Sequence, residues 1–285
     1  MMISGLPTPE GMDFRRARLR AFFGGILGAI SGHSRKLLAF DEVREKLHLG
    51  GPIYRGVQTV PLSRIVGSVD RYRDFDRAFF PTQSHTEERW RRVNRAWYLD
   101  ISLPPIVLYQ VGDVYFVVDG HHRVSVARNQ GQEFLEAEVR EVRARVPLTP
   151  DVEADDLEFL GDRVEFLERT QIDRVLPGVE ISPTVLGGYD RLVEHLAVHR
   201  YFLCQELDRE VSSEEAIRHW YETLYRPVVE VIRSSGILED FTDRTEADLY
   251  LWVMDHLHYL RQDPERPITD PAAAAEDFLR ILEGG

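Results

Sequence analysis

The sequence predicts an α+β protein, with a small mixed sheet domain preceded by helices and followed by a mostly α-helical domain. Three observations support this prediction. Alternating β-rich runs are confined to about residues 56–143. Apolar residues at helical spacing occur before and after that region. Acidic residues dominate the second half, where residues 151–285 hold 31 Asp and Glu against 13 Lys and Arg.

The first fifty residues and the region around residue 90 are predicted to be helical. Helical patterns cover 14–30, 40–47 and 87–99, and Asp41 near the start of the second can cap it. The Gly-Gly-Pro sequence at 50–52 then ends the helical pattern. These residues separate an N-terminal helical segment from the sheet.

Strands and one helix are predicted in the middle of the chain. Two β-rich runs flank Gly112-Asp113, which is a typical hairpin turn. A short helix follows Gly120 and ends before Gly131, a common helix stop. The predicted strands are an alternating segment through Val60, Leu62 and Ile65, and runs at 106–109, 114–118 and 136–142.

The second half of the chain is predicted to be helical and acidic. Pro227 is expected to start a new helix, and Asp243 to Glu246 to form a capping box ahead of the next. We expect three parts: an N-terminal helical segment at 1–52, a sheet domain at 53–146, and an acidic helical domain at 147–285.

Charge and composition exclude several classes of protein. The net charge is −13, yet residues 1–150 hold 22 Lys and Arg against 17 Asp and Glu. The whole chain is therefore a poor general DNA binder, although its first half can attract phosphates. Cys204 is the only cysteine, so no intramolecular disulfide forms. The longest apolar run, 22–30, is too short to span a membrane, so we expect a cytoplasmic protein with no membrane partner.

The segment from Asp119 to Arg123 is the part of the sequence best suited to binding a ligand. A buried strand ends in Asp119-Gly120, and a helix begins at once with His121, His122 and Arg123. Free N–H groups and the positive dipole end of a helix attract anions at such a junction. Gly120 permits close approach, Arg123 offers a planar fork of donors, and the imidazoles add donors or a proton acceptor. These features predict a phosphate-binding site.

An alternative interpretation is a tight strand–helix turn without a ligand. Asp119 would then cap the helix, and the histidines would cover neighbouring surface. Three donors at one helix start favour the phosphate site, because an acidic cap alone would satisfy the turn.

This segment resembles the signature of the ParB/sulfiredoxin superfamily, in which a strand and a Gly-x-x-Arg motif precede a helix, here with Ala127. Residues 60–65 are similar to the opening strand and turn of that fold. The resemblance covers about residues 56–143 and implies a nucleotide-binding sheet domain. The chain as a whole resembles a bacterial family of ParB-like proteins with a helical C-terminal half.

Several residues differ from the motifs of known members, and these differences exclude some of the activities found in the superfamily. The motif with which ParB partition proteins bind a CTP phosphate is similar to this sequence at Gly120, Arg123 and Ala127. However, His121 and His122 replace a Glu and an Arg of that motif, which counts against the ParB clamp mechanism. Sulfiredoxins have their catalytic cysteine where His121 stands, so sulfinic-acid reduction is not implied.

Free serine kinases of the same superfamily carry the motif Asp-Gly-His-His-Arg unchanged. This resemblance implies that residues 120–123 bind phosphate and that Asp119 places a metal ion or orients a histidine. Asp119, His121 and His122 are then the candidate catalytic residues. Phosphoryl transfer needs mainly positioning and charge neutralisation, together with a base. The candidate bases are Asp70, Asp74, Glu87 and Glu88.

Other side chains are candidates for supporting roles. Arg71, Arg73 and Asp74 follow the first strand, which in this fold lies beside the phosphate site. Residues 88–95 hold four arginines around Trp90, with Trp97 just beyond. This pattern is typical either of a nucleic-acid contact or of an amphipathic helix whose tryptophan face packs on the sheet.

His195 and His199 are spaced to face one side of a helix, but no third ligand motif accompanies them, so we predict no metal site.

We therefore expect a ParB-like nucleotide-binding protein that takes ATP, ADP or CTP, with Mg²⁺ as an optional partner, and that hydrolyses or transfers phosphate. Two alternatives remain open: a DNA-associated ParB-like regulator or nuclease, and a nucleotide-switched protein-interaction module. Assembly as a homodimer also remains open.

Overall fold

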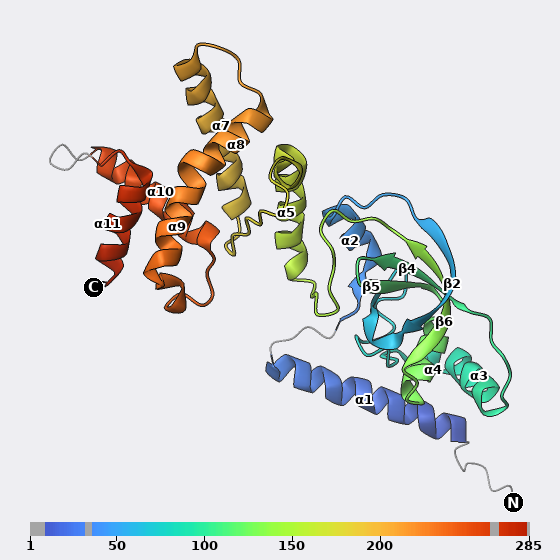
Figure 1. The fold of residues 1–285 in the computed structure, drawn as a ribbon. Helices are drawn as coiled ribbons and strands as arrows, with labels where there is room; N and C mark the ends of the chain where they lie inside the picture. The colour runs from blue at the N-terminus through green and yellow to red at the C-terminus, as the bar shows by residue number, and fades with distance from the viewer. Residues whose placement is uncertain (1–8, 32–35, 263–267, 284–285) are drawn as a thin grey trace, which may run out of the picture. The chain divides into compact units, whose positions relative to one another are not determined.

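The protein is a mixed α/β chain in which a six-stranded mixed sheet precedes a mostly helical C-terminal part. The computed structural model describes residues 9–31, 36–262 and 268–283. The chain divides into two compact units, Met1–Gly161 and Asp162–Gly285 (Figure 1). The predicted combination of a sheet region and a helical second half is confirmed at this level.

The sheet combines parallel and antiparallel strand pairs. Its strand order is β1-β3-β5-β4-β6-β2. β3 pairs in parallel with β1 and β5, and β4 in parallel with β6, whereas the β4–β5 and β2–β6 pairs are antiparallel. The strands are β1 (Leu38–Ala39), β2 (Ile53–Pro61), β3 (Ile65–Ser68), β4 (Ile106–Val111), β5 (Val114–Asp119) and β6 (Phe134–Glu141).

The predicted hairpin between β4 and β5 is confirmed. Gly112 in its turn has a φ of +58°, a conformation that a side chain disfavours. The alternating segment at 60–65 is not one strand, because a 3₁₀ turn at Leu62–Arg64 separates β2 from β3. This turn sends the chain from the β2 edge of the sheet to β3, beside β5.

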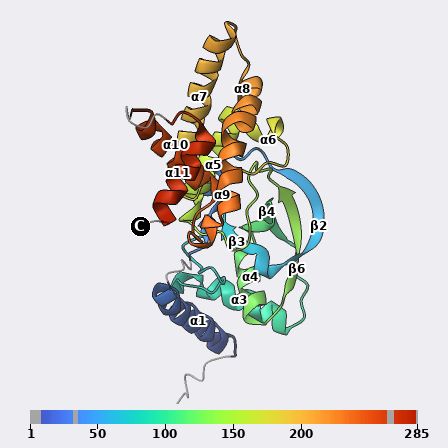
Figure 2. The ribbon, with the colours of Figure 1, turned by 60° about the vertical axis from the view of Figure 1, so that its left-hand side comes forward.

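Four helices accompany the sheet in the described part of the first unit, and all four fall where the sequence predicts helices. They are α1 (Pro9–Ser31), α2 (Phe40–Lys46), α3 (Glu87–Tyr98) and α4 (His121–Asn129). α4 packs on the sheet through Val124 and Ala127. Both ribbon views place α3 beside α4, with α1 against α3 (Figures 1 and 2). The start of α4 is thereby placed between the sheet and α3.

The second unit is helical where the structure describes it. α5 runs across the boundary between the units. Pro227 lies in the first turn of α9 as expected, but the helical backbone is continuous from α8 into α9, so Pro227 does not begin a separate helix. A π-helical turn at Tyr221–Tyr225 leads into α9. The helices are α5 (Asp156–Thr170), α6 (Ile172–Val175), α7 (Gly188–Leu207), α8 (Ser213–Trp220), α9 (Arg226–Ser235), α10 (Glu246–Gln262) and α11 (Pro271–Glu283).

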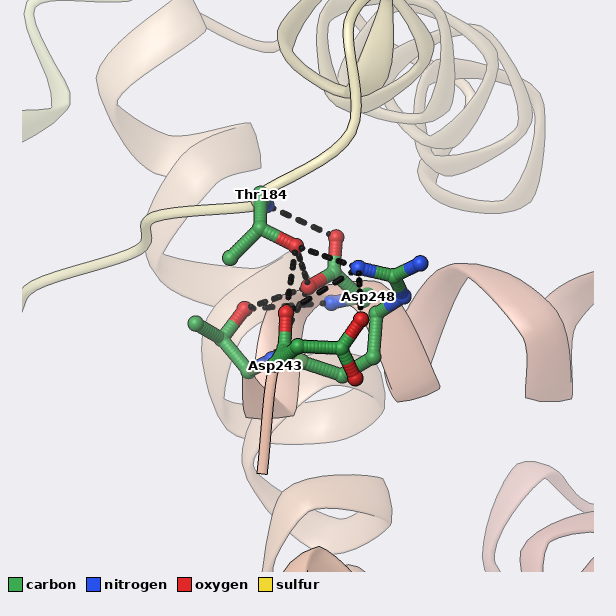
Figure 3. A network of polar contacts seen from close by, with 5 residues as sticks. Thr184, Asp243 and Asp248 are labelled. Atoms are coloured by element: carbon green, nitrogen blue, oxygen red, sulfur yellow. Dashed lines mark hydrogen bonds and ion pairs between the residues drawn. The ribbon is translucent and has the colours of Figure 1, made fainter. Parts of the chain in front are cut away.

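The capping box predicted at Asp243–Glu246 is wrong by two residues. Thr245 and Asp248 form it instead: the Thr245 N–H donates to Asp248 Oδ2 at 2.9 Å, and the Asp248 N–H donates to Thr245 Oγ1 at 3.4 Å. Asp248 also accepts two hydrogen bonds from Thr184 at 2.8 Å (Figure 3). Burial alone would raise the pKa of Asp248, but these hydrogen bonds outweigh it and hold its pKa below the ordinary value.

Among the described helices, none combines the length and apolar character needed to cross a membrane.

Candidate functional site

The backbone at the start of α4 has free hydrogen-bond donors. β5 ends at Asp119, and Gly120 turns the chain into α4 with a φ of +101°. No side chain caps this helix start, so the alternative in which Asp119 caps α4 is wrong. The first intrahelical bond is donated by Val124 N–H to Gly120 O at 3.0 Å. The N–H groups of His121, His122 and Arg123 therefore have no acceptor among the described residues.

Gly120 is required by protein packing. A Cβ at this position would lie 2.5 Å from Cγ2 of Ile106, on β4, and its positive φ disfavours any side chain. The sequence prediction attributed this glycine to ligand approach. The structure adds a second, sufficient reason, which is the close passage of β4 behind the turn.

A concavity of about 360 Å³ opens at this helix start. Its lining brings together β5, the α4 start, the loop after β3, α3 and the loop before β4. The lining residues are Asp70, Arg71, Arg89, Val93, Leu103, Pro104, Val118, Asp119, Gly120, His121, His122 and Arg123. All five residues of the predicted motif, and Arg71, therefore lie around one hollow.

Both imidazoles of the motif are buried. His121 Nε2 lies 2.7 Å from Ser68 Oγ, at the end of β3. His122 Nε2 lies 3.0 Å from Nη1 of Arg71. Phe75 packs near both rings, roughly parallel to His121 at 6.2 Å and edge-on to His122 at 5.5 Å. The histidines are held inward by protein contacts.

Burial keeps both histidines neutral at pH 7. Desolvation, followed by repulsion from the Arg71 guanidinium, lowers the pKa of His121 from 6.5 to about 4. The same two causes lower the pKa of His122 to about 3. Neutral imidazoles add no positive charge to the site, so any positive charge for a ligand must come from arginine and the helix dipole.

The hydrogen bond between Arg71 and His122 determines the tautomer of His122. Arginine can only donate, so Nε2 of the neutral His122 must accept. The proton of His122 is then on Nδ1, which is buried and has no hydrogen-bond partner in the structure. The site therefore contains an unsatisfied buried donor in addition to the free backbone N–H groups.

Acidification is expected to destabilise the protein through these two histidines. Both native pKa values lie below 6.5, so their contribution to stability is complete above pH 6.5 and is lost as pH falls toward 4. We expect a loss of about 2 kcal/mol per histidine in the free energy of unfolding between pH 7.5 and 5. Urea denaturation at the two pH values measures it.

The control for this pH effect is the double variant His121→Gln/His122→Gln. Other titrating groups remain in both proteins, so the difference between the two pH dependences reports these histidines alone. Equal pH dependences would contradict the assignment of two neutral buried imidazoles.

Arg123 is engaged by protein groups in this structure. Its guanidinium donates from Nη1 to the carbonyls of Pro104 and Pro105, and from Nη2 to Asp119 at 2.5 Å. These hydrogen bonds link the loop before β4 to the start of α4. Asp119 is largely exposed, and its described partner is Arg123 rather than a histidine.

The three supporting candidates from the loop after β3 have different positions. Arg71 lines the concavity, donates its backbone N–H to Ser68 Oγ at 3.0 Å, and lies 3.8 Å from Asp74. Asp74 thus lies close to the Arg71 guanidinium but does not line the concavity. Arg73 is exposed over the ring of Tyr72 and does not line it either.

Arg89 of α3 is a site residue that the sequence did not single out. It lines the concavity and makes no hydrogen bond or ion pair with any residue that the structure describes. Its neighbour Trp90 is fully buried and donates its indole N–H to Ser125 Oγ at 2.9 Å. The burial of Trp90 fixes the rotation of α3, and this rotation brings Arg89 to the site.

The burial of Trp90 favours the amphipathic packed helix over the nucleic-acid contact, but the tryptophan packs on helices α1 and α4 rather than on the sheet. A fully buried indole cannot stack on a nucleobase, so Trp90 belongs to the core. Its ring packs edge-on against Phe14 of α1 at 5.5 Å. Trp97, which is 41% exposed, remains accessible.

The candidate bases also separate by position. Asp70 lines the concavity, whereas Asp74 contacts Arg71 and His85 outside it. Glu87 and Glu88 lie near arginines one turn later on α3, and neither lines the concavity. Of the four candidates, Asp70 is the one that lines the concavity.

The two histidines at the predicted helical spacing in the second unit make different contacts. His199 Nε2 lies 2.9 Å from Nδ1 of His219, whereas His195 contacts the ring of Tyr250 edge-on at 5.8 Å. Among the described residues, no group of three or more His, Cys, Asp or Glu side chains can hold a metal ion.

A second concavity, of about 620 Å³, adjoins the first. The two share Val93, Leu103, Pro104 and Arg123. The second is lined by apolar side chains, including Trp97, and by polar or charged ones that include Asp100, Gln132 and Glu136. A ligand larger than phosphate can therefore extend from the α4 start past Arg123 into this second hollow.

No protein-family model matches the chain, and a search of curated proteins finds no match. The structure shows a mixed α/β protein in which the uncapped start of α4 lies in a concavity that is also lined by arginine side chains.

Proposed function

We propose that the concavity at the start of α4 binds the phosphates of a nucleotide, in a sheet unit similar to the ParB/sulfiredoxin fold. The observation that carries this proposal is the uncapped start of α4 in a hollow also lined by Arg71 and Arg89. Free backbone N–H groups and guanidinium groups together favour an anion with several oxygens.

The second concavity supports a nucleotide rather than a smaller phosphate. Its apolar lining and the accessible Trp97 suit a nucleobase, and its polar residues can select among bases. ATP, ADP and CTP are the candidate ligands.

The proposed chemistry is hydrolysis or transfer of the terminal phosphoryl group. Asp70 would take the proton from the attacking hydroxyl or water, while the α4 start and the arginines neutralise the developing charge. A Mg²⁺ ion fits this site only together with the nucleotide. With Asp70 as the base, Asp119 is the carboxylate ligand that the concavity offers, so phosphate and water oxygens would complete the coordination.

A nucleotide panel tests the proposal. At saturating concentration, one of ATP, ADP or CTP, with or without Mg²⁺, is expected to raise the melting temperature by about 5 °C or more. Arg89→Ala is expected to weaken the affinity about tenfold or more without lowering stability, because Arg89 is exposed and makes no hydrogen bond or ion pair with a described residue.

Arg92→Ala is the matched control for this panel. Arg92 is on the same helix and exposed, but it pairs with Glu88 at 3.2 Å and does not line the concavity. It should therefore leave the shift unchanged. The absence of a shift with every nucleotide, or an equal loss in both variants, would contradict the proposal.

The DNA-associated regulator or nuclease is the second candidate. Arginines on the outer side of α3 line a separate shallow concavity, which could contact a phosphate backbone. Arg91 and Arg92 lie 3.6 and 3.2 Å from Glu87 and Glu88, so their charge is partly neutralised already. Binding to duplex DNA with a steep salt dependence, lost in Arg92→Ala but not in Arg89→Ala, would favour this candidate.

A further inference from the structure

Helix α1 packs on the protein through one face only. Phe14 and Ala17 are buried there and form a cluster with Trp90 of α3 and Val126 of α4. Ala21 continues this buried face one turn later. These positions lie on one side of the helix, since they are three and four residues apart.

The opposite side of α1 carries a second apolar stripe that the described chain leaves exposed. Met12, Leu19 and Phe23 are 43%, 54% and 58% exposed. Their spacings of seven and four residues place them in one row, opposite Ala17 and Ala21. The adjacent Phe22 on the same helix is also exposed.

Arginines outnumber acidic residues beside this stripe, where Asp13 follows Met12 and Glu87 of α3 lines a hollow with Leu19 and Phe22. Arg15, Arg16, Arg18 and Arg20 are all exposed on α1. The sequence contains no Asp or Glu from Phe14 to Phe40, although the whole chain has a net charge of −13. Large apolar side chains with an excess of arginines beside them are found on helices that lie in a membrane interface.

We propose that α1 docks the protein on an anionic membrane surface, with Leu19 and Phe23 entering the interface and the arginines contacting lipid phosphates. Charge complementarity selects this occupant. A second copy of the helix would bring two sets of arginines together, and a nucleic acid would leave the apolar row without a partner. This proposal departs from the sequence expectation of no membrane partner, because a surface contact needs no spanning segment.

Flotation with lipid vesicles tests this proposal on the full chain. The protein is expected to float with vesicles of phosphatidylcholine and phosphatidylglycerol, and not with phosphatidylcholine alone. Arg15→Gln/Arg18→Gln is expected to reduce the affinity for anionic vesicles roughly thirtyfold. Leu19→Ser/Phe23→Ser is expected to reduce it on the order of a hundredfold, because the apolar contribution is lost.

The control is Tyr201→Ser/Phe202→Ser on α7, where two large apolar side chains are 59% and 63% exposed. It should float like the unchanged protein. No flotation with anionic vesicles, or an equal loss in this control, would overturn the proposal. Duplex DNA binding that is lost in Arg15→Gln/Arg18→Gln, without flotation, would assign the helix to nucleic acid. A dimer that becomes a monomer in Leu19→Ser/Phe23→Ser, without flotation, would assign it to self-association.

Discussion

Replacing Trp90 with alanine is expected to lower the free energy of unfolding by about 4 kcal/mol. The indole is fully buried between α1, α3 and α4, and it packs edge-on against Phe14. Its removal leaves a large cavity and an unpaired Ser125 hydroxyl where the indole N–H donated before. Urea denaturation of the full chain, followed by tryptophan fluorescence and circular dichroism, measures the loss.

Trp97→Ala is the matched control, because it removes the same side chain seven residues later on the same helix. Trp97 is 41% exposed, so its replacement is expected to cost about 1 kcal/mol or less. It should instead weaken nucleotide binding, because Trp97 lines the second concavity. Equal losses of stability in the two variants would show that α3 does not have the rotation described above.

Gly120→Ala is expected to lower the free energy of unfolding by about 3 kcal/mol and to abolish ligand binding. Part of the loss in stability comes from placing a side chain on a backbone with a φ of +101°, and part comes from the overlap of the new Cβ with Ile106. Relief of this overlap moves the start of α4 away from β4, which displaces the free N–H groups. Calorimetry with the nucleotide found in the panel measures the binding loss, and urea denaturation the stability.

Gly131→Ala separates the two causes. Gly131 follows the other end of α4 with a φ of +76°, but a Cβ there would meet nothing within 4 Å. Only the conformational cost remains, so a loss of about 1 kcal/mol and unchanged binding are expected. If Gly131→Ala abolished binding as well, the position of the α4 start would not be the reason for the effect of Gly120→Ala.

The regular elements follow closely from local patterns. The hairpin around Gly112, the helix after Gly120 and the helix beginning at Glu87 occur where the spacing of apolar residues predicts them. The prediction is less accurate where a tertiary contact selects between local options. At Thr245, the capping partner is Asp248 because Thr184, 64 residues from Asp248, also donates to this carboxylate.

The candidate site can also be predicted only in part from local sequence, and the rest depends on tertiary contacts. Its position between β5 and α4 is visible in the motif, because strand, glycine and helix are consecutive there. The engagement of Arg123 by Pro104 and Pro105 is not visible, since it depends on where β4 lies. The position of Arg89 at the site is not visible in the sequence either, because it depends on which face of α3 is buried.

The sequence by itself determined the β4–β5 hairpin, the helices around the sheet, the glycine turn that starts α4, and the separation of basic and acidic halves, because these follow from neighbouring residues. Only the tertiary structure decided that His121 and His122 are neutral, that Arg71 and Arg89 share one hollow, and that α1 keeps an exposed apolar face. The physical reason is burial: a side chain's charge, partners and access to solvent are set by residues distant in the chain.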